Sequence, residues 1–369
     1  MVNKVYLVGA GPGKADLITV RGLNILKQAD VVIYDYLVDK RILEEARQDA
    51  ELICCDTLDK ERYANGFLVH NEKINQLVIK KVKEGKKVVR LKNGDPAIFS
   101  RLSQELESLA KNKIEFEIVP GVTASSAASA FSGIPLTERR FASSCIFVTG
   151  HEDPTKEESL LDWESIAKQG TIVLYMAVEN LRKIIRKLIA IGKSPFTPVA
   201  VIQEASLITQ KMVKGNLKNI IRKVEEVGIR PPAVIIIGEV VKLEKNFNWL
   251  KKSKRILFTG LSLERFFLKG TYFHLPLIKI EPLDDYGEFD HYLKEIKNFD
   301  WIVFTSRYGV EYFFKRLRRV NLDSRILKGI KIAAIGNSTK NRLLDFGIIA
   351  DLVPKRESSE GLVREFKNI

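Results

Sequence analysis

The segment VVRLKNGDPAIFSR, residues 88–101, joins a strand-like run to a polar loop. The β-branched run ends at Lys92, and Asn93, Gly94 and Asp95 follow it, directly before a proline. A carboxylate between Gly and Pro indicates a ligand-binding loop, although a simple turn uses the same residue types. The loop is therefore predicted to hold a ligand, with a structural turn as the alternative.

A second aspartate, Asp35, follows the apolar run VVIY at residues 31–34. Ligands of α/β proteins bind beyond the carboxyl ends of the strands, where a carboxylate is able to act as a general base. The alternative role is the N-cap of a helix over DKRILEEA, and Asp39 fills that role better. Asp35 is therefore predicted to be a catalytic base.

The Gly-rich stretch VGAGPG, residues 8–13, has the form of a strand-to-helix turn. Its glycines follow the pattern G-x-G-x-G, which differs from the dinucleotide fingerprint G-x-G-x-x-G. Pro12 also removes a backbone N–H that a pyrophosphate would need. The turn thus predicts close approach of a ligand other than a nicotinamide dinucleotide, and a purely structural turn is the alternative.

Further strand-like runs also end in polar or polarizable residues. VPGVTASSAAS enters a helix rich in small residues, TGH at residues 149–151 ends another run, and Tyr175 and Met176 end a third. The small residues suit either a flat ligand or close helix packing. Because the carboxyl ends of parallel strands share one edge, these groups are predicted to converge on one cleft.

The elements that position these residues alternate between strands and helices along the chain, which predicts an α/β fold with largely parallel sheets. A Pro-Gly break follows residue 119, and the charged segment 244–254 with Trp249 is predicted to be a linker packed against one domain. The predicted domains cover residues 1–119, 120–250 and 254–369. Strands are predicted near 4–11, 30–37, 86–92, 114–121, 143–150, 170–176, 197–203, 232–238, 255–260, 299–306 and 330–336.

Composition limits the possible partners. The 369 residues carry a formal net charge of +14, which favours polyanionic partners, although many Lys and Arg simply solvate helix faces. The three cysteines and four histidines have no metal-ligand spacing, so no metal site is predicted. Neither a signal peptide nor a membrane-spanning run is found, so the protein is predicted to be cytoplasmic, without a membrane partner.

Taken together and in order, these motifs resemble the tetrapyrrole methylase family, and within it the uroporphyrinogen-III C-methyltransferases. The resemblance implies two α/β domains with S-adenosylmethionine bound between them, in a homodimer. It also implies methylation of uroporphyrinogen III to precorrin-2, via precorrin-1, on the route to sirohaem and cobalamin. The segments that carry it are VYLVGAGPG, ADVVIYD, VVRLKNGDP, VPGVTAS, SGIPLT, VTGHE, LYM, TPVAVI and PPAVIIIGEVV.

Carried over residue by residue, the resemblance assigns Asp35 to the family's proton acceptor. The implied substrate is a polycarboxylate, so basic residues near the motifs are predicted to bind it. These substrate-binding residues are Arg90, Lys92, Arg101, Arg139 and Arg140. The implied contacts to S-adenosylmethionine are Pro12, Asn93, Gly94, Asp95, Ile98, Thr123, Ala124, Met176 and Ala205.

The chain departs from the family's pattern at three places. Asn93 stands where the family has the first glycine of GGDP, and FSRLSQE, residues 99–105, stands where the family has FGRGGEE. The lysine that serves the family as proton donor has no clear counterpart, because a direct count places Thr57 there, with Lys60 and Arg62 close by. The proton donor is therefore left unassigned.

Residues from about Lys254 onward resemble the N-terminal half of uroporphyrinogen-III synthase, whose product is the substrate of the methylase. In that family the chain returns to complete its first lobe, and here the sequence stops at Ile369 before such a return. This domain is therefore predicted to be incomplete and without synthase activity. The matching segments are RILFTG, LPLIKIEPL, FDWIVFTSRYGVEYFF and IAAIGNSTKNRLLDFGIIADLVP.

Three alternative functions stay open. The basic charge permits methylation of ribosomal RNA by a related fold, but base-stacking aromatics with interleaved arginines are not evident, so no nucleic-acid partner is predicted. Methylation of a later precorrin is the second alternative. The third is a cofactor-binding regulator without catalysis, motivated by Asn93 and the missing lysine.

Overall fold

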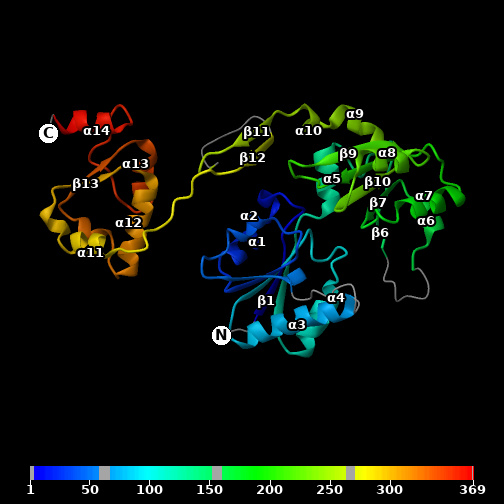
Figure 1. Ribbon diagram of the computed structural model, residues 1–369, viewed down its shortest axis with the longest axis horizontal. Helices are drawn as coiled ribbons and strands as arrows, with labels where there is room; N and C mark the ends of the chain where they lie inside the picture. The colour runs from blue at the N-terminus through cyan, green and yellow to red at the C-terminus, as the bar shows by residue number, and fades with distance from the viewer. Residues whose placement is uncertain (1–3, 58–66, 152–159, 263–270, 368) are drawn as a thin grey trace. The chain divides into compact units, whose positions relative to one another are not determined.

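The computed structural model describes residues 4–57, 67–151, 160–262, 271–367 and 369. The chain forms two compact units, one of residues 1–257 with 267–273 and the other of residues 258–266 with 274–369. The first unit contains two five-stranded sheets, which Figure 1 shows in blue to cyan and in green. The predicted domain boundary after residue 119 falls between these sheets and stays a prediction.

The first sheet is entirely parallel, with the strand order β3-β2-β4-β1-β5. Its central strand β4 is buried on both faces, as the apolar runs of a parallel sheet require. All carboxyl strand ends therefore lie at one edge of this sheet. The strands are β1 (Lys4–Gly9), β2 (Val31–Tyr34), β3 (Glu51–Cys54), β4 (Val88–Lys92) and β5 (Glu115–Val119).

Helices cover both faces of the first sheet (Figure 1). Val88 packs into the core that α3 and α4 cover, whereas its neighbour Val89 packs into the core on the α1 and α2 side, as the two-residue strand period requires. The predicted N-cap is confirmed, because the Asp39 carboxylate accepts the Arg41 N–H at 2.9 Å. These elements are η1 (Ala15–Leu17), α1 (Val20–Leu26), α2 (Lys40–Leu43), η2 (Cys55–Thr57), α3 (Phe67–Lys83) and α4 (Leu102–Lys111).

The second sheet is mixed, with the order β6-β7-β10-β8-β9. Only β6 and β7 pair in parallel, so the expectation of largely parallel pairing is wrong for this sheet. The segment between β8 and β9 is too short for a parallel crossover and makes an antiparallel pair. The strands are β6 (Cys145–Thr149), β7 (Thr171–Tyr175), β8 (Pro198–Gln203), β9 (Lys211–Asn216) and β10 (Ala233–Ile237).

The predicted linker with Trp249 is helical and packs against α5. The Trp249 indole N–H donates to the carbonyl of Ala130 at 2.8 Å, and its ring lies 5.5 Å from the ring of Phe131. The prediction that this segment packs against one domain is therefore confirmed. The helices of this region are α5 (Ala124–Ser132), α6 (Trp163–Ala167), α7 (Leu181–Ala190), α8 (Ile220–Val227), η3 (Glu239–Leu243), α9 (Glu244–Phe247) and α10 (Trp249–Lys252).

The second unit is built around a parallel pair, β13 (Trp301–Phe304) and β14 (Lys331–Ala334). Its core includes Val310, Leu317 and the stacked rings of Phe314 and Phe346, whose centroids are 4.3 Å apart. No helix among the described residues is long and apolar enough to cross a membrane. The strands β11 (Arg255–Phe258) and β12 (Thr271–His274) pair with each other and lie largely in the first unit. The remaining elements are α11 (Gly287–Lys294), η4 (Ile296–Asn298), α12 (Arg307–Arg319), η5 (Ser324–Leu327), α13 (Asn337–Leu344) and α14 (Ser359–Phe366).

Candidate active site

A backbone bridge between Gly11 and Gly94 joins the carboxyl ends of β1 and β4. The Gly11 N–H donates to the Gly94 carbonyl at 3.2 Å, and the Gly94 N–H donates to the Gly11 carbonyl at 2.8 Å. Both glycines have positive φ angles, +83° and +68°, which residues with a side chain rarely adopt. The VGAGPG turn and the KNGDP loop therefore lie side by side, at the sheet edge where ligands of α/β folds bind.

A third glycine, Gly121, lies against the same bridge. A Cβ atom added to Gly121 would lie 2.2 Å from the Gly94 carbonyl oxygen and 2.8 Å from the Cα atom of Gly9. Such distances are far below van der Waals contact, so only glycine fits at this position. The ends of β1, β4 and β5 thus meet backbone to backbone, which leaves main-chain groups rather than side chains at this edge.

The Asp95 carboxylate holds the KNGDP loop to the segment after β5. One of its oxygens accepts the Gly121 N–H at 2.9 Å and the other accepts the Ala97 N–H at 2.7 Å. The Asp95 side chain therefore stabilises the loop through hydrogen bonds to backbone N–H groups. Its predicted contact to the cofactor stays a prediction.

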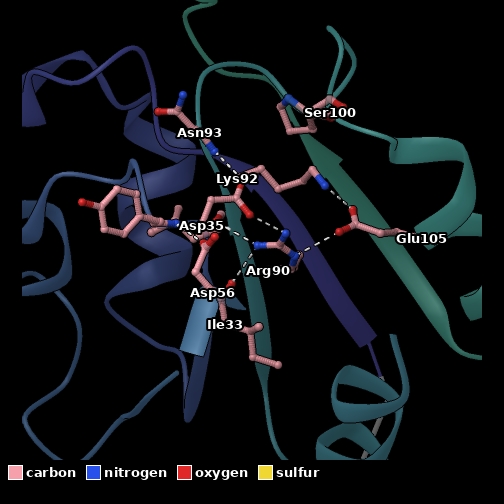
Figure 2. A network of polar contacts seen from close by, with 11 residues as sticks. Ile33, Asp35, Asp56, Arg90, Lys92, Asn93, Ser100 and Glu105 are labelled. Atoms are coloured by element: carbon pink, nitrogen blue, oxygen red, sulfur yellow. Dashed lines mark hydrogen bonds and ion pairs between the residues drawn. The ribbon is translucent and has the colours of Figure 1, made fainter. Parts of the chain in front are cut away.

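Asp35 lies directly after β2 and is bound from β4 (Figure 2). Its Oδ1 accepts a hydrogen bond from the Nη2 of Arg90 at 2.5 Å, and its Oδ2 accepts the Asn93 N–H at 3.0 Å. These two donors hold the carboxylate in place. The side chain is still 31% exposed, so it reaches the surface at the edge of the sheet. This is the placement that a proton acceptor at a strand end requires.

Charges beside Asp35 control its ionisation. Burial by itself would raise the pKa of Asp35, but the positive charges of Arg90 and Lys92 and the hydrogen bond from Asn93 together hold that pKa below its usual range. Asp35 is therefore ionised at neutral pH. It is ready to accept a proton, and its basicity depends on how much positive charge its neighbours place on it.

The Arg90 guanidinium lies between two carboxylates, Asp35 and Glu105 (Figure 2). Its Nε donates to Glu105 at 3.0 Å and its Nη1 donates to the backbone carbonyls of Leu91 and Ile33, at 3.2 and 3.4 Å. Burial would lower the pKa of Arg90, but the two carboxylates raise it, so the group stays charged. All three guanidinium nitrogens therefore have acceptors inside the fold.

Arg90 and Lys92 are two residues apart in β4, so their side chains lie on the same face of the strand. The Nζ of Lys92 donates to the second oxygen of Glu105 at 2.5 Å. The side chains of Arg90 and Lys92 are only 6% and 3% exposed. The prediction that Arg90 and Lys92 bind substrate carboxylates therefore needs correction, because their charged groups are buried and already paired with Glu105 and Asp35. Burial, then the charge of Arg90, holds the pKa of Lys92 below its ordinary value.

Tyr175, the last residue of β7, connects the second sheet to α5. Its hydroxyl lies 2.7 Å from the Oγ1 of Thr123, the N-cap residue of α5, and accepts the Ser125 N–H at 3.1 Å. Its ring lies 5.0 Å from that of Phe99, which follows the KNGDP loop. The predicted residues Ile98 and Ala124 both pack against the core of the second sheet. The loop after β4 thus spans from the first sheet to the second.

Several residues after β7 and β8 have a left-handed backbone. The φ angles are +52° at Met176, +49° at Glu204 and +78° at Ser206, and each such angle costs about 1–3 kcal/mol. Residues of this kind gather at ligand sites, where the surrounding structure holds them in place. Met176 is 54% exposed and Ala205 is buried. Two predicted cofactor contacts therefore lie in the strained segments.

The turn that contains Pro12 contacts the strained segment after β8. The Lys14 N–H donates to the Ser206 hydroxyl at 3.2 Å. A Cβ atom added to Gly13 would lie 3.2 Å from the Leu207 side chain. The structure therefore brings predicted cofactor residues of the first sheet, Pro12 and the KNGDP loop, close to the ends of β7 and β8. Their contact with a cofactor stays a prediction.

The remaining predicted cations lie at the surface. Arg101 and Arg139 are exposed, and Arg140 pairs with Glu138 while its guanidinium lies over the Phe141 ring. Their predicted binding to substrate stays a prediction.

Thr57, at the position of the family's lysine, donates its hydroxyl to the Cys54 carbonyl at 2.8 Å. Lys60 and Arg62 lie outside the described residues. The proton donor is thus still unassigned.

Sequence reasoning missed two residues of this site, Glu105 and the hydroxyl of Tyr175. A signal for Glu105 was present, since Arg90 and Lys92 are two residues apart and must share one face of a buried strand. Buried cations need anionic partners, and the helix that covers this face is one source of them. No comparable signal marks the Tyr175 hydroxyl, whose partners depend on how α5 packs.

Comparisons with known proteins agree with this arrangement. The family model described as "Tetrapyrrole (Corrin/Porphyrin) Methylases" matches residues 4–221, and the model described as "Uroporphyrinogen-III synthase HemD" matches residues 268–369. The uroporphyrinogen-III C-methyltransferase of Bacillus subtilis is 36% identical over 362 residues, which are 95% of this chain and 73% of that protein.

A Methanosarcina barkeri protein described as "S-adenosyl-L-methionine-dependent uroporphyrinogen III methyltransferase" is 45% identical over 242 residues, 65% of this chain and 93% of that protein. A crystal structure of uroporphyrin-III C-methyltransferase from Thermus thermophilus, complexed with S-adenosylhomocysteine, is 33% identical with a TM-score of 0.54. The match covers 65% of this chain and 94% of that one. The chain spans about half the length of the sirohaem synthases that it also matches, 54% and 52%.

Proposed function

The chain belongs to the tetrapyrrole methylase family, and from this premise we propose that it is a uroporphyrinogen-III C-methyltransferase that uses S-adenosylmethionine. The observation that carries the proposal is the 45% identity to the Methanosarcina barkeri methyltransferase, over 93% of that protein. The family match over residues 4–221 includes Asp35 and every predicted cofactor residue. The finer parts of the proposal are the product, precorrin-2, its use for sirohaem and cobalamin, and a cytoplasmic homodimer.

The residues at the sheet edge fit S-adenosylmethionine. The close approach of Gly9, Gly94 and Gly121 keeps side chains away from this edge, which suits a ligand that lies close to the backbone. The half-exposed Met176 and the aromatic ring of Phe99 supply apolar contacts on the side of the second sheet. In the proposal Gly94, Ile98, Thr123 and their neighbours in the predicted set hold the cofactor.

When bound, S-adenosylmethionine supplies an electrophilic methyl group to an electron-rich pyrrole carbon. The new C–C bond leaves a proton on the pyrrole ring that must be removed, and the ionised Asp35 accepts it in the proposal. Arg90 and the Asn93 N–H hold the Asp35 carboxylate in one orientation, and the side chain stays partly exposed at the sheet edge. These contacts support the assignment of Asp35 as the base.

The net charge of +14 supports a polycarboxylate substrate. With Arg90 and Lys92 engaged inside the fold, we propose that the exposed Arg101, Arg139 and Arg140 attract the substrate. Because surface charges are screened by salt, the KM for uroporphyrinogen III is expected to rise with ionic strength while kcat changes little.

The test is an anaerobic assay with uroporphyrinogen III and S-adenosylmethionine, read by mass spectrometry. A product that is two methyl groups heavier supports the proposal. A protein that binds S-adenosylhomocysteine and leaves uroporphyrinogen III unmethylated would contradict it, and the same assay with later precorrins would then follow. Size-exclusion chromatography with light scattering tests the homodimer.

A further inference from the structure

Glu105 is a buried carboxylate outside the residue set that the family resemblance assigns. It lies in the first turn of α4, a helix that covers one face of the first sheet, and its side chain is 12% exposed. Its two oxygens bind two different cations, the Nε of Arg90 at 3.0 Å and the Nζ of Lys92 at 2.5 Å. A carboxylate that bridges two buried cations beneath a proposed catalytic base requires an explanation.

We propose that Glu105 is a positioning residue of the methylation reaction, which acts on Asp35 through Arg90 and Lys92. This inference rests on the proposed function. It assigns Glu105 two effects, one on the orientation of Arg90 and one on the charge that reaches Asp35.

The first effect is geometric. The Arg90 guanidinium is a rigid planar fork, so acceptors on two of its edges fix the direction of the third. Glu105 holds the Nε edge, and the carbonyls of Ile33 and Leu91 hold Nη1. The Nη2 group is thereby aimed at the Oδ1 of Asp35, which lies 2.5 Å away. Figure 2 shows Asp35 and Glu105 on opposite sides of this guanidinium.

The second effect is electrostatic. Two cations and two carboxylates balance each other in this network, and each cation has Glu105 as a partner. Without the Glu105 charge, Asp35 would face two cations alone and would bind a proton less readily. A less basic carboxylate removes a proton more slowly, because general-base catalysis follows the basicity of the acceptor.

The other groups that face Asp35 in the described residues are consistent with this control. They are the Asn93 N–H from the loop after β4, the Cys55 thiol of η2, and Asp56, whose carboxylate accepts the Tyr36 N–H. Burial raises the pKa of Cys55 to about 12, so the thiol is neutral at the pH of the reaction. Among the groups that the structure describes here, Glu105 is the carboxylate bound directly to both Arg90 and Lys92.

The test compares Glu105→Gln with the double variant Glu105→Gln, Lys92→Met in the uroporphyrinogen III assay, using the full chain. The single variant leaves an excess positive charge under Asp35, and the double variant restores the balance with an apolar chain of similar length. We expect kcat of the single variant to fall about tenfold, with the KM for both substrates within about twofold of wild type. The kcat of the double variant should be roughly fivefold higher than that of the single variant. Glu107→Gln, an exposed glutamate of the same helix, is the matched control.

Each outcome decides the inference. A wild-type kcat for Glu105→Gln would overturn it, as would a double variant that folds and is no faster than the single one. If Glu105→Gln does not fold, the double variant still tests the inference. If Glu105 acts through packing, the kcat of the double variant should be far below wild type. If Glu105 acts through its charge, that kcat should be close to wild type. Absence of methylation by the wild-type chain would overturn the proposed function itself, whereas wild-type turnover with an indifferent Glu105 overturns this inference alone.

Discussion

The hydroxyl of Tyr175 lies 2.7 Å from the Oγ1 of Thr123, its partner 52 residues earlier in the chain. The same hydroxyl accepts the Ser125 N–H at 3.1 Å, so the end of β7 is tied to the first turn of α5. Thr123, a predicted cofactor contact, is a partner in the first of these bonds, and Met176, another predicted contact, directly follows Tyr175. The position of both contacts therefore depends on one oxygen atom.

Tyr175→Phe is expected to weaken binding of S-adenosylhomocysteine about three- to tenfold, because the ring stays and the two hydrogen bonds are lost. Isothermal titration calorimetry measures this change. Tyr292→Phe, at an exposed tyrosine of the second unit, is the control and should bind as wild type does. Equal affinities for Tyr175→Phe and wild type would show that the hydroxyl does not position the site.

Gly121→Ala is expected to destabilise the protein by roughly 1–3 kcal/mol or more, because its Cβ would overlap the Gly94 carbonyl and the Gly9 backbone. These neighbours are backbone atoms that cannot move aside without breaking the Gly11–Gly94 bridge. Urea denaturation measures the loss. Gly85→Ala is the comparison, since its Cβ would meet open space and only its positive φ opposes the change. A Gly121→Ala protein as stable as wild type would refute the close approach.

Asp35→Asn is expected to lower kcat by ~10²-fold or more, since the amide does not accept the ring proton. Both Asp35 oxygens accept from donors, Arg90 and Asn93, and an amide offers only one acceptor. The variant should therefore also lose roughly 1–3 kcal/mol of stability. Asp39→Asn, at the N-cap of α2, is the control for loss of a nearby carboxylate and should keep kcat. An Asp35→Asn enzyme with wild-type kcat would exclude Asp35 as the base.

The stability part of this prediction depends on pH. The folded-state pKa of Asp35 lies below its usual value, so its contribution is present above the unfolded pKa of about 3.9. That contribution is lost as the pH falls through the lower, folded-state pKa. The stability difference between wild type and Asp35→Asn should therefore be larger at pH 7 than at pH 3.5. A difference that grows on acidification would contradict the assigned direction of the pKa.

The strand ends at Asp35 and Asp95 could be predicted from the sequence because both follow buried runs of a parallel sheet. The rule that such ends share one edge then places them together, without knowledge of the packing. The strand directions in the second sheet could not be predicted, because a buried apolar run such as PVAVIQ looks alike in either direction. The error over Arg90 and Lys92 has a similar origin. Their charge was visible, but the pairing of both cations with Glu105 depends on how α4 packs on the sheet.

Some features of the site have no local sequence signal at all. Met176 has a φ of +52° although a glycine would adopt that angle more easily. The conformation is imposed by the structure around the end of β7, where Tyr175 is held by α5. Strain of this kind is set by tertiary contacts, so propensities of single residues do not reveal it.

Cys55 is expected to resist alkylation in the folded protein. Burial raises its pKa to about 12, so at pH 8 only about one thiol in ten thousand is ionised, and the thiolate is the reactive form. Iodoacetamide labelling followed by mass spectrometry should leave Cys55 unmodified in native buffer and modify it in urea. Labelling of Cys55 at the rate of a free cysteine would show that the structure around this buried thiol opens readily.

Residues 1–253 are expected to methylate uroporphyrinogen III with a kcat within about twofold of the whole chain. The Methanosarcina barkeri relative aligns over 242 residues and 93% of its length, so an enzyme of that size suffices there. The cut keeps α10, whose Trp249 donates to Ala130 and packs on Phe131, both in the helix that begins at Ala124. A second cut after Phe247 removes this anchor and should lower the melting temperature and the affinity for S-adenosylhomocysteine. A folded 1–253 protein without activity would show that residues after 253 take part in methylation.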